Sequence, residues 1–171
     1  DCPCVVVKDT RKALLDIAAY YRRKFSPILV GVTGSVGKTT TKEMIALVLS
    51  EKYNTLKTQG NFNNEIGLPK TLFNLDSSYQ AAVIEMGMSH FGEIERLSRT
   101  ASPTMGVVTN IGFSHIENLK SQDGILQAKL EILKGMADNA PLVVNGDDER
   151  LSQLKTKLTG RPCLLYTSPS P

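Results

Sequence analysis

The stretch that decides the fold is ILVGVTGSVGKTT, residues 28–40. Its first half, residues 28–33, is a short apolar run typical of a buried strand. Two glycines follow at positions 34 and 37, and after Lys38 the apolar residues return at helical spacing. A strand, a glycine-bearing loop and a helix in this order predict a loop that holds phosphate groups.

The residue types in this loop each suit a phosphate ligand. Gly34 and Gly37 let the backbone turn so that its N–H groups point inward at phosphate oxygens. The start of the following helix adds the positive end of its dipole, while Lys38 can reach the β- and γ-phosphates and the Thr39 hydroxyl can ligate Mg²⁺. The usual spacing has glycine where this chain has Val32, so the loop takes the shorter form G-x-x-G-K-T. An ordinary strand–turn–helix junction is the alternative, and the flanking strand and helix favour nucleotide binding.

The composition excludes several classes of protein. With 171 residues, 41% hydrophobic and 22% charged, the chain is typical of one globular domain. A net charge of +3 is too weak to indicate nucleic acid, and no apolar stretch approaches the roughly 20 residues of a membrane helix or forms a signal peptide. The cysteines form no disulfide framework, so we expect a reducing cytoplasm; they are Cys2, Cys4 and Cys163.

Apolar strand-like runs alternate with helical patterns along the chain. The strand-like runs are residues 28–33, 81–86, 105–110 and 141–145, and the helical patterns are residues 39–52, 66–75, 91–99, 122–136 and 148–158. Strands that are apolar on both faces predict an α/β fold with a mostly parallel sheet covered by helices on both faces. In such sheets ligands bind beyond the carboxyl ends of the strands.

An earlier helix is predicted to start after Asp9 or Thr10 and to close on the basic cluster at residues 22–24. That cluster suits a helix C-terminus, with a phosphate-binding patch as the alternative. Residues 163–171 are rich in Ser and Pro and show neither helical nor strand period. We expect them to be a non-native tail outside the fold.

Two polar side chains stand at the ends of later strands. Glu85 could hold Mg²⁺ through its oxygens, or it could be a helix-capping or salt-bridged residue. His115 follows the next strand, where a site role and a structural role are both open.

Three further candidates remain ambiguous from spacing alone. Lys129 shares the apolar face of its helix, where it either snorkels outward or is held for chemistry. Asn63 and Asn64 lie in a glycine-bearing loop and could bind substrate or only shape the turn. Asn145 could meet an adenine or ribose, or it could belong to a turn.

Taken together, these motifs resemble the central ATPase domain of the Mur ligases, the ATP-dependent amide ligases of peptidoglycan synthesis. The motifs that carry the resemblance are residues 33–43, 61–69, 85–88, 110–112 with His115, 128–132 and 145–148. Within the family, residues 85–88 and the Ser35-Val36 loop favour the branch that adds D-alanyl-D-alanine to a UDP-N-acetylmuramoyl-tripeptide. One departure is Lys120, where the family usually has glycine.

The resemblance implies roles for the matching positions. ATP phosphates would be held by Gly34, Ser35, Val36, Gly37, Lys38, Thr39 and Thr40, with Asn145 near the adenine. Mg²⁺ would be bound with the help of Thr39, Glu85, His115 and Lys129, the lysine being carried as a carbamate. The implied catalytic residues are Lys38, Glu85, His115 and Lys129, and Asn63 and Asn64 would lie near the γ-phosphate and the acceptor substrate.

The resemblance also implies a domain organisation and a reaction. Residues 1–27 would be the tail of an N-terminal UDP-substrate domain with its linker, residues 28–162 an incomplete ATP-binding domain, and the C-terminal domain would be absent. The substrate carboxylate would attack the γ-phosphate, and an amine would displace phosphate from the acyl phosphate. We expect a monomer that binds small-molecule substrates, and an isolated chain that forms no product.

Two other functions stay open from the sequence. One is a related ligase on the same core, such as a folylpolyglutamate synthetase or a different Mur ligase. The other is a non-catalytic nucleotide-binding module in which the phosphate loop serves as a switch.

Overall fold

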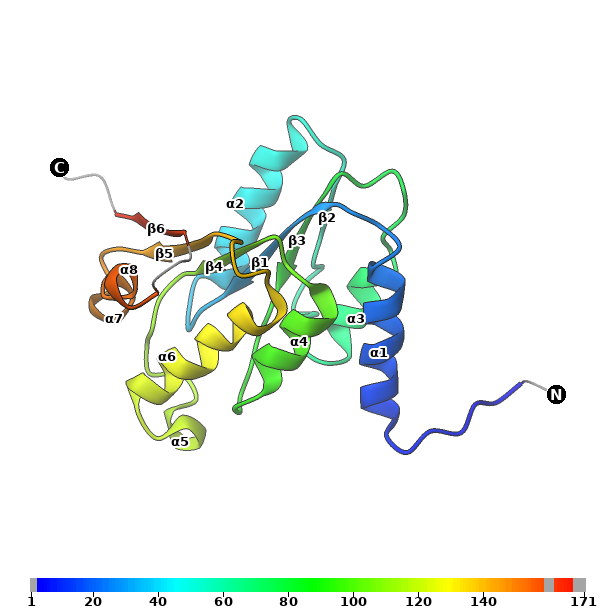
Figure 1. The fold of residues 1–171 in the computed structure, drawn as a ribbon, viewed down its shortest axis with the longest axis horizontal. Helices are drawn as coiled ribbons and strands as arrows, with labels where there is room; N and C mark the ends of the chain where they lie inside the picture. The colour runs from blue at the N-terminus through cyan, green and yellow to red at the C-terminus, as the bar shows by residue number, and fades with distance from the viewer. Residues whose placement is uncertain (1–2, 159–161, 168–171) are drawn as a thin grey trace.

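The core of the molecule is one parallel sheet (Figure 1). The computed structural model describes residues 3–158 and 162–167. Within them the strands run in the order β2-β3-β1-β4-β5-β6, and every paired neighbour is parallel. The strands are β1 (Ile28–Thr33), β2 (Thr55–Lys57), β3 (Ala81–Glu85), β4 (Met105–Val108), β5 (Leu142–Asn145) and β6 (Cys163–Tyr166). Because all strands point the same way, their carboxyl ends meet at one edge.

Helices connect these strands. They are α1 (Thr10–Arg22), α2 (Lys38–Ser50), α3 (Gly67–Leu72), α4 (Glu93–Ala101), α5 (Ile116–Leu119), α6 (Gln122–Leu130), the 3₁₀ turn η1 (Glu131–Gly135), α7 (Glu149–Ser152) and α8 (Leu154–Lys157). Within the described part of the chain, none of them is long and apolar enough to cross a membrane.

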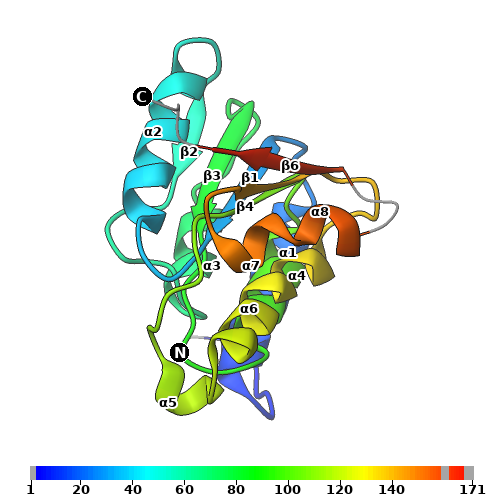
Figure 2. The ribbon, with the colours of Figure 1, turned by 90° about the vertical axis from the view of Figure 1, so that its left-hand side faces the viewer.

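Alternate residues of β1 pack into two separate hydrophobic cores. Val30 and Val32 pack with Ala46 beneath α2, which covers one face of the sheet. Leu29 points the other way, into the larger core that the remaining helices build on the opposite face. Figure 2 shows α2 on one side of the sheet and α1, α4 and α6 on the other. The predicted fold class, a parallel sheet covered on both faces, is therefore confirmed.

Several elements differ from the sequence prediction. The strand β2 is three residues long with only Leu56 buried, too short to leave a pattern, and the four-residue α5 was likewise not predicted. The predicted helix over residues 122–136 divides into α6 and the 3₁₀ turn η1, and that over residues 148–158 divides into α7 and α8.

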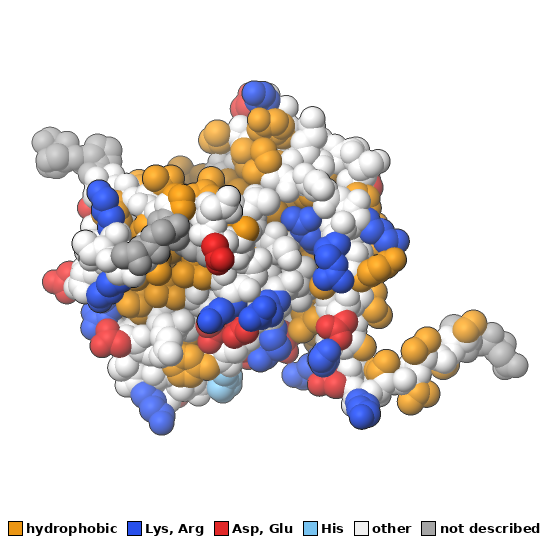
Figure 3. Space-filling view, in the orientation of Figure 1, with side chains coloured by type: hydrophobic (Ala, Val, Ile, Leu, Met, Phe, Trp, Pro, Cys, Tyr) orange, Lys and Arg blue, Asp and Glu red, His pale blue; other side chains and the backbone are white. Residues whose placement is uncertain are grey.

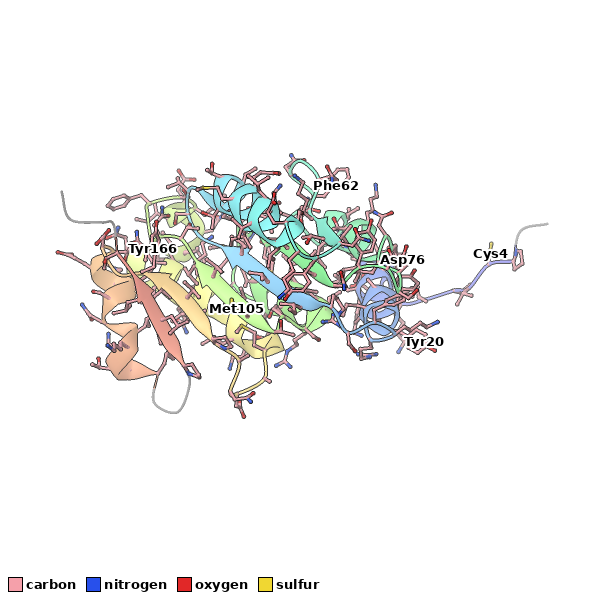
Figure 4. All side chains as sticks on the ribbon, turned by 90° about the horizontal axis from the view of Figure 1, so that it is seen from above. Cys4, Tyr20, Phe62, Asp76, Met105 and Tyr166 are labelled. Atoms are coloured by element: carbon pink, nitrogen blue, oxygen red, sulfur yellow. The ribbon has the colours of Figure 1, made fainter. Side chains whose placement is uncertain are left out.

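The segment that the sequence analysis placed outside the fold contains a strand. Cys163–Tyr166 form β6, which pairs in parallel with β5 from Leu142 to Asn145. The expectation that residues 163–166 lie outside the fold was therefore wrong, because backbone pairing to β5 needs no alternating pattern in a four-residue edge strand. Figure 4 places Tyr166 at this edge and Met105 of β4 nearer the middle of the sheet. Residues 168–171 lie outside the described residues.

The basic cluster after α1 has a structural partner. Asp9 caps the start of α1, as predicted, by accepting from the N–H groups of Arg11 and Lys12. At the other end the buried Arg22 donates to the carbonyl oxygens of Ala101 (2.6 Å) and Ser102 (3.3 Å), where α4 ends. Arg22 thus satisfies the carbonyls of a neighbouring helix end, which favours the structural reading of this cluster over a phosphate patch.

Charge is not concentrated on the face shown in Figure 3, where basic and acidic side chains are interspersed. This distribution agrees with the small net charge of +3. It offers no extended basic stripe of the kind that nucleic acid would require on that face.

Candidate active site

The loop between β1 and α2 depends on its glycines. Gly34 has a φ of +149° and Gly37 a φ of +78°, both in the region that disfavours side chains. A Cβ on Gly34 would lie 1.9 Å from Oγ1 of Thr109. The loop is also fixed to Asn110, whose carbonyl accepts from Ser35 N (3.1 Å) and whose Oδ1 accepts from Val36 N (3.0 Å). The loop therefore has a defined shape against the end of β4.

Lys38 folds back over this loop. Its Nζ donates to the carbonyl oxygens of Gly34 (3.0 Å) and Ser35 (3.2 Å). Burial lowers the pKa of Lys38, and the nearby charge of Glu85 partly opposes that shift. The ammonium group thus lies where phosphate oxygens would replace the two carbonyls as acceptors.

Glu85 ends β3 beside the phosphate loop, as the parallel topology predicted. The side chain is buried, with 1% of its surface exposed. Its Oε2 accepts from Thr39 Oγ1 (3.0 Å), and its Oε1 accepts from Asn63 Nδ2 (2.8 Å). The Glu85 N–H donates to Thr58 Oγ1 at 3.0 Å. Two segments of the chain therefore hold this carboxylate in one orientation, and a third fixes the backbone that carries it.

Lys129 is buried, so the outward, snorkelling orientation that spacing left open is excluded. Only 2% of its surface is exposed, and it lines the cavity beside the phosphate loop. Burial, with a smaller contribution from the charge of Lys38, lowers its pKa to about 7. A large share of this amine is therefore neutral near neutral pH.

Several of the candidate residues line one cavity of about 440 Å³, and Glu85 lies beside it, bonded to Asn63. Its lining includes Lys38, Lys129 and His115, and Asn63 and Asn64 border it from the loop after β2. His115 precedes α5 with a φ of +64°. Residues distant in sequence are therefore brought to the carboxyl edge of the sheet.

The two neighbouring asparagines do different things. Asn63 contacts the carboxylate of Glu85, whereas Asn64 Oδ1 accepts from Ile66 N (3.1 Å) and Gly67 N (2.9 Å) at the start of α3. Asn64 thus shapes the loop that places Asn63. Asn145 does not line this cavity, and its Oδ1 accepts from Asp147 N (3.0 Å) within the turn after β5.

Two residues that the sequence analysis did not select support the site. Glu131 accepts from Gly92 N (2.8 Å) and Glu95 N (3.2 Å), and so ties the turn after Lys129 to the start of α4. The sequence held one signal for Glu131, because it lies in the 128–132 motif, two positions after Lys129. The second is Lys42, which lies fully buried in α2.

Among the described residues, no three His, Cys, Asp or Glu side chains cluster closely enough to hold a metal ion. Of the acids that line the cavity, Glu65 pairs with Arg96, and Glu93 accepts from Ser89 N (2.6 Å) and His90 N (3.2 Å). A metal at this site would therefore need oxygens from a bound nucleotide as well as from Thr39 and Glu85.

The fold and this loop define a P-loop α/β domain. The family model of the Mur ligase middle domain matches residues 32–169, and the chain belongs to this family. It is similar to UDP-N-acetylmuramoyl-tripeptide–D-alanyl-D-alanine ligase of Bacillus subtilis, with 47% identity over 161 residues that make up 91% of this chain and 35% of that protein. The chain thus spans about a third of the length of that relative.

Solved structures agree with the assignment. The MurF ligase from Thermotoga maritima in complex with ADP superposes with a TM-score of 0.88 at 34% identity, over 97% of this chain and 38% of that one. The apo form of FPGS from L. casei gives a TM-score of 0.64 at 15% identity, over 99% of this chain and 53% of that one. The second likeness shows a shared fold alone.

Proposed function

We propose that this chain is the nucleotide-binding part of an ATP-dependent ligase that joins D-alanyl-D-alanine to UDP-N-acetylmuramoyl-tripeptide. The observation that carries the proposal is the convergence of Lys38, Lys129 and His115 on one cavity, beside Glu85, in a chain that is 47% identical to a ligase of that name. The ADP complex of the Thermotoga maritima relative supports nucleotide binding at the same fold.

The residues present fit a magnesium nucleotide. The loop at residues 34–40 would hold the phosphates through its N–H groups, and Lys38 would offset their charge. Thr39 and Glu85 would hold Mg²⁺, because their oxygens already lie 3.0 Å apart at the mouth of this loop. When bound, Mg²⁺ would neutralise negative charge on the phosphates. His115, which lines the same cavity, would complete the set.

Lys129 would enter this site as a carbamate, as the family resemblance implies. A neutral amine can attack CO₂ and lose a proton, which gives an anionic carbamate and releases H⁺. The lowered pKa of Lys129 supplies the neutral amine near neutral pH. The product would turn a buried cation beside Lys38 into an oxygen-bearing anion, and so remove the like-charge repulsion between the two lysines.

The proposed reaction is the one that the family resemblance implies, and the placement of these groups is compatible with it. The tripeptide carboxylate attacks the γ-phosphorus of ATP, which gives an acyl phosphate and ADP. The amine of D-alanyl-D-alanine then attacks the acyl carbon, forms the amide, and releases phosphate and a proton. Lys38 offsets the charge that develops on the transferred phosphoryl group. Asn63, fixed to Glu85, would orient the entering carboxylate.

Calorimetric titration of the chain with ATP and ADP, with and without Mg²⁺, tests the proposal. We expect binding that Mg²⁺ strengthens. We also expect no amide formation by the isolated chain, because the resemblance assigns amine capture to a further domain. A chain that binds neither nucleotide would contradict the proposed function, and product formed by this chain alone would contradict the need for that domain.

A further inference from the structure

Lys42 is a buried cation that the proposed reaction does not use. It lies in the second turn of α2, and its side chain is fully buried. Buried lysines are rare unless a negative or polar partner compensates them, because removing an ammonium group from water is costly. The groups around its ammonium group therefore indicate which negative charge Lys42 compensates.

Three oxygens surround the ammonium group of Lys42. Its Nζ lies 2.8 Å from the carbonyl oxygen of Thr58, 3.0 Å from Oε1 of Glu43 and 4.0 Å from Oε2 of Glu85. Glu43 is half-exposed and also pairs with Lys57, so its charge is shared between two lysines and screened by water. Glu85 is buried with Lys42, so their mutual attraction is the less screened one.

The other charged side chains around the cavity are of both signs. Lys38 and Lys129 face it, while Glu65 and Glu93 are already bound to Arg96 and to backbone N–H groups. Before any ligand arrives, Lys42 is the ammonium group within 4.0 Å of the Glu85 carboxylate among the described residues, and the charge of Lys38 acts on Glu85 from a greater distance. A divalent cation that approached Glu85 would meet this ammonium group a few ångströms behind the carboxylate, and the two cations would repel each other.

We propose that Lys42 is the resident counter-cation of Glu85: it positions that carboxylate and opposes metal binding until nucleotide phosphates enter the site. The proposal rests on the nucleotide-binding function proposed above. Phosphate oxygens would bring enough negative charge to outweigh Lys42, so metal and nucleotide would bind together rather than metal alone. Lys42 is thus a positioning residue, since it acts through Glu85 and Thr58.

Manganese titration of the nucleotide-free chain, followed by the electron paramagnetic resonance of free Mn²⁺, tests this role. We expect weak binding by the wild-type chain and binding about tenfold tighter or more in Lys42→Met, because one opposing charge is removed. The gain should disappear in the Lys42→Met, Glu85→Gln double variant. Lys57→Met is the matched control, because Lys57 pairs with Glu43 and should leave Mn²⁺ affinity unchanged.

Several results would overturn the proposal: unchanged or weaker Mn²⁺ binding in Lys42→Met, a gain that survives in the double variant, or the same gain in Lys57→Met. If circular dichroism shows that Lys42→Met does not fold, Lys42→Gln replaces it, since its amide can still donate to Thr58. A titration of the wild-type chain alone is a further test, because equal Mn²⁺ affinity with and without ADP would contradict the proposal. Failure to bind ADP would instead overturn the nucleotide-binding function, and the nucleotide-free titrations would still report on Lys42.

Discussion

Thr39 and Glu85 are joined before any ligand binds, because Oγ1 of Thr39 donates a 3.0 Å hydrogen bond to Oε2 of Glu85. Thr39 lies in the first turn of α2, and Glu85 ends β3, 46 positions later. Parallel pairing of β1 with β3 aligns Val32 with Glu85 and so sets this meeting point. The two oxygens proposed to hold Mg²⁺ thus need little rearrangement to do so.

Glu85→Gln is expected to remove most of the effect of Mg²⁺ on nucleotide affinity. A neutral amide oxygen is a much poorer ligand for a hard cation than a carboxylate. We expect ATP affinity in Mg²⁺ to fall by about tenfold or more, since interactions with charged groups contribute roughly 1.5–3 kcal/mol. Calorimetry with Mg²⁺ and with a chelator measures the two affinities. Glu51→Gln, at the exposed end of α2, is the control, and an equal loss in both conditions would show that Glu85 does not act through the metal.

Lys38→Ala is expected to weaken nucleotide binding whether or not Mg²⁺ is present. The ammonium group now donates to two carbonyl oxygens of the loop and would transfer to phosphate oxygens. A loss of about ten- to a hundredfold follows from the strength of such charged hydrogen bonds. Lys52→Ala removes a positive charge beyond the other end of α2 and should have little effect. Unchanged affinity in Lys38→Ala would exclude this loop as the phosphate site.

The sequence predicts the edge of the sheet where ligands bind better than it predicts the buried charges there. Residues 28–33 form β1 within the predicted bounds, since five of its six residues are buried and apolar or small enough to pack. Parallel order then brings Lys38 and Glu85 together without further information. Lys129 stayed undecided, because spacing gives the helix face but not the neighbouring elements that close over it.

Lys42 shows most clearly which feature of the site the sequence could not predict. Its burial depends on the carbonyl of Thr58, which follows β2, and β2 has no detectable pattern of its own. A lysine in the second turn of an otherwise mixed helix is ordinarily a solvated residue. Only the tertiary arrangement of α2, β2 and β3 makes it a partner of Glu85.

Stability should depend on pH through Lys129. Its pKa is about 7 in the folded chain and 10.5 as the ordinary value, so between these pH values the unfolded chain holds the proton and the folded chain does not. The free energy of unfolding should therefore rise as the pH rises from about 7 towards 10.5, and the burial penalty is fully present below pH 7. Between pH 6.5 and 9 the deprotonation of this residue should raise the free energy of unfolding by roughly 2.5 kcal/mol.

Urea denaturation of the wild-type chain and of Lys129→Met at both pH values measures this contribution, in buffers stripped of CO₂. The difference between the two proteins isolates Lys129 from other titrating groups. Lys129→Met should be the more stable protein at pH 6.5. The same pH dependence in both proteins would contradict the assignment.

Carbamate formation on Lys129 is tested with ¹³C-labelled bicarbonate. The wild-type chain should show a carbamate carbon resonance that grows as the pH rises through 7, because the neutral amine is the reactive form. Lys129→Met lacks the amine and should lose that resonance, while Lys134→Met, in the 3₁₀ turn η1, should keep it. A resonance of equal intensity in Lys129→Met would assign the carbamate to another group.

Lys120→Gly is expected to stabilise the chain. Lys120 follows α5 with a φ of +66°, and its N–H donates to the carbonyl of Ile116 at 2.7 Å. A side chain in the left-handed region costs about 1–2 kcal/mol, whereas glycine adopts it freely but gives the unfolded chain about 0.4–1 kcal/mol more entropy to lose. The net gain should be about 0.5–1 kcal/mol, or a rise of roughly 2 °C in Tm. Asn118→Gly, inside α5, should lower Tm instead, because glycine weakens a helix interior. A lower Tm in Lys120→Gly would mean that the lysine side chain makes a stabilising contact that outweighs the strain.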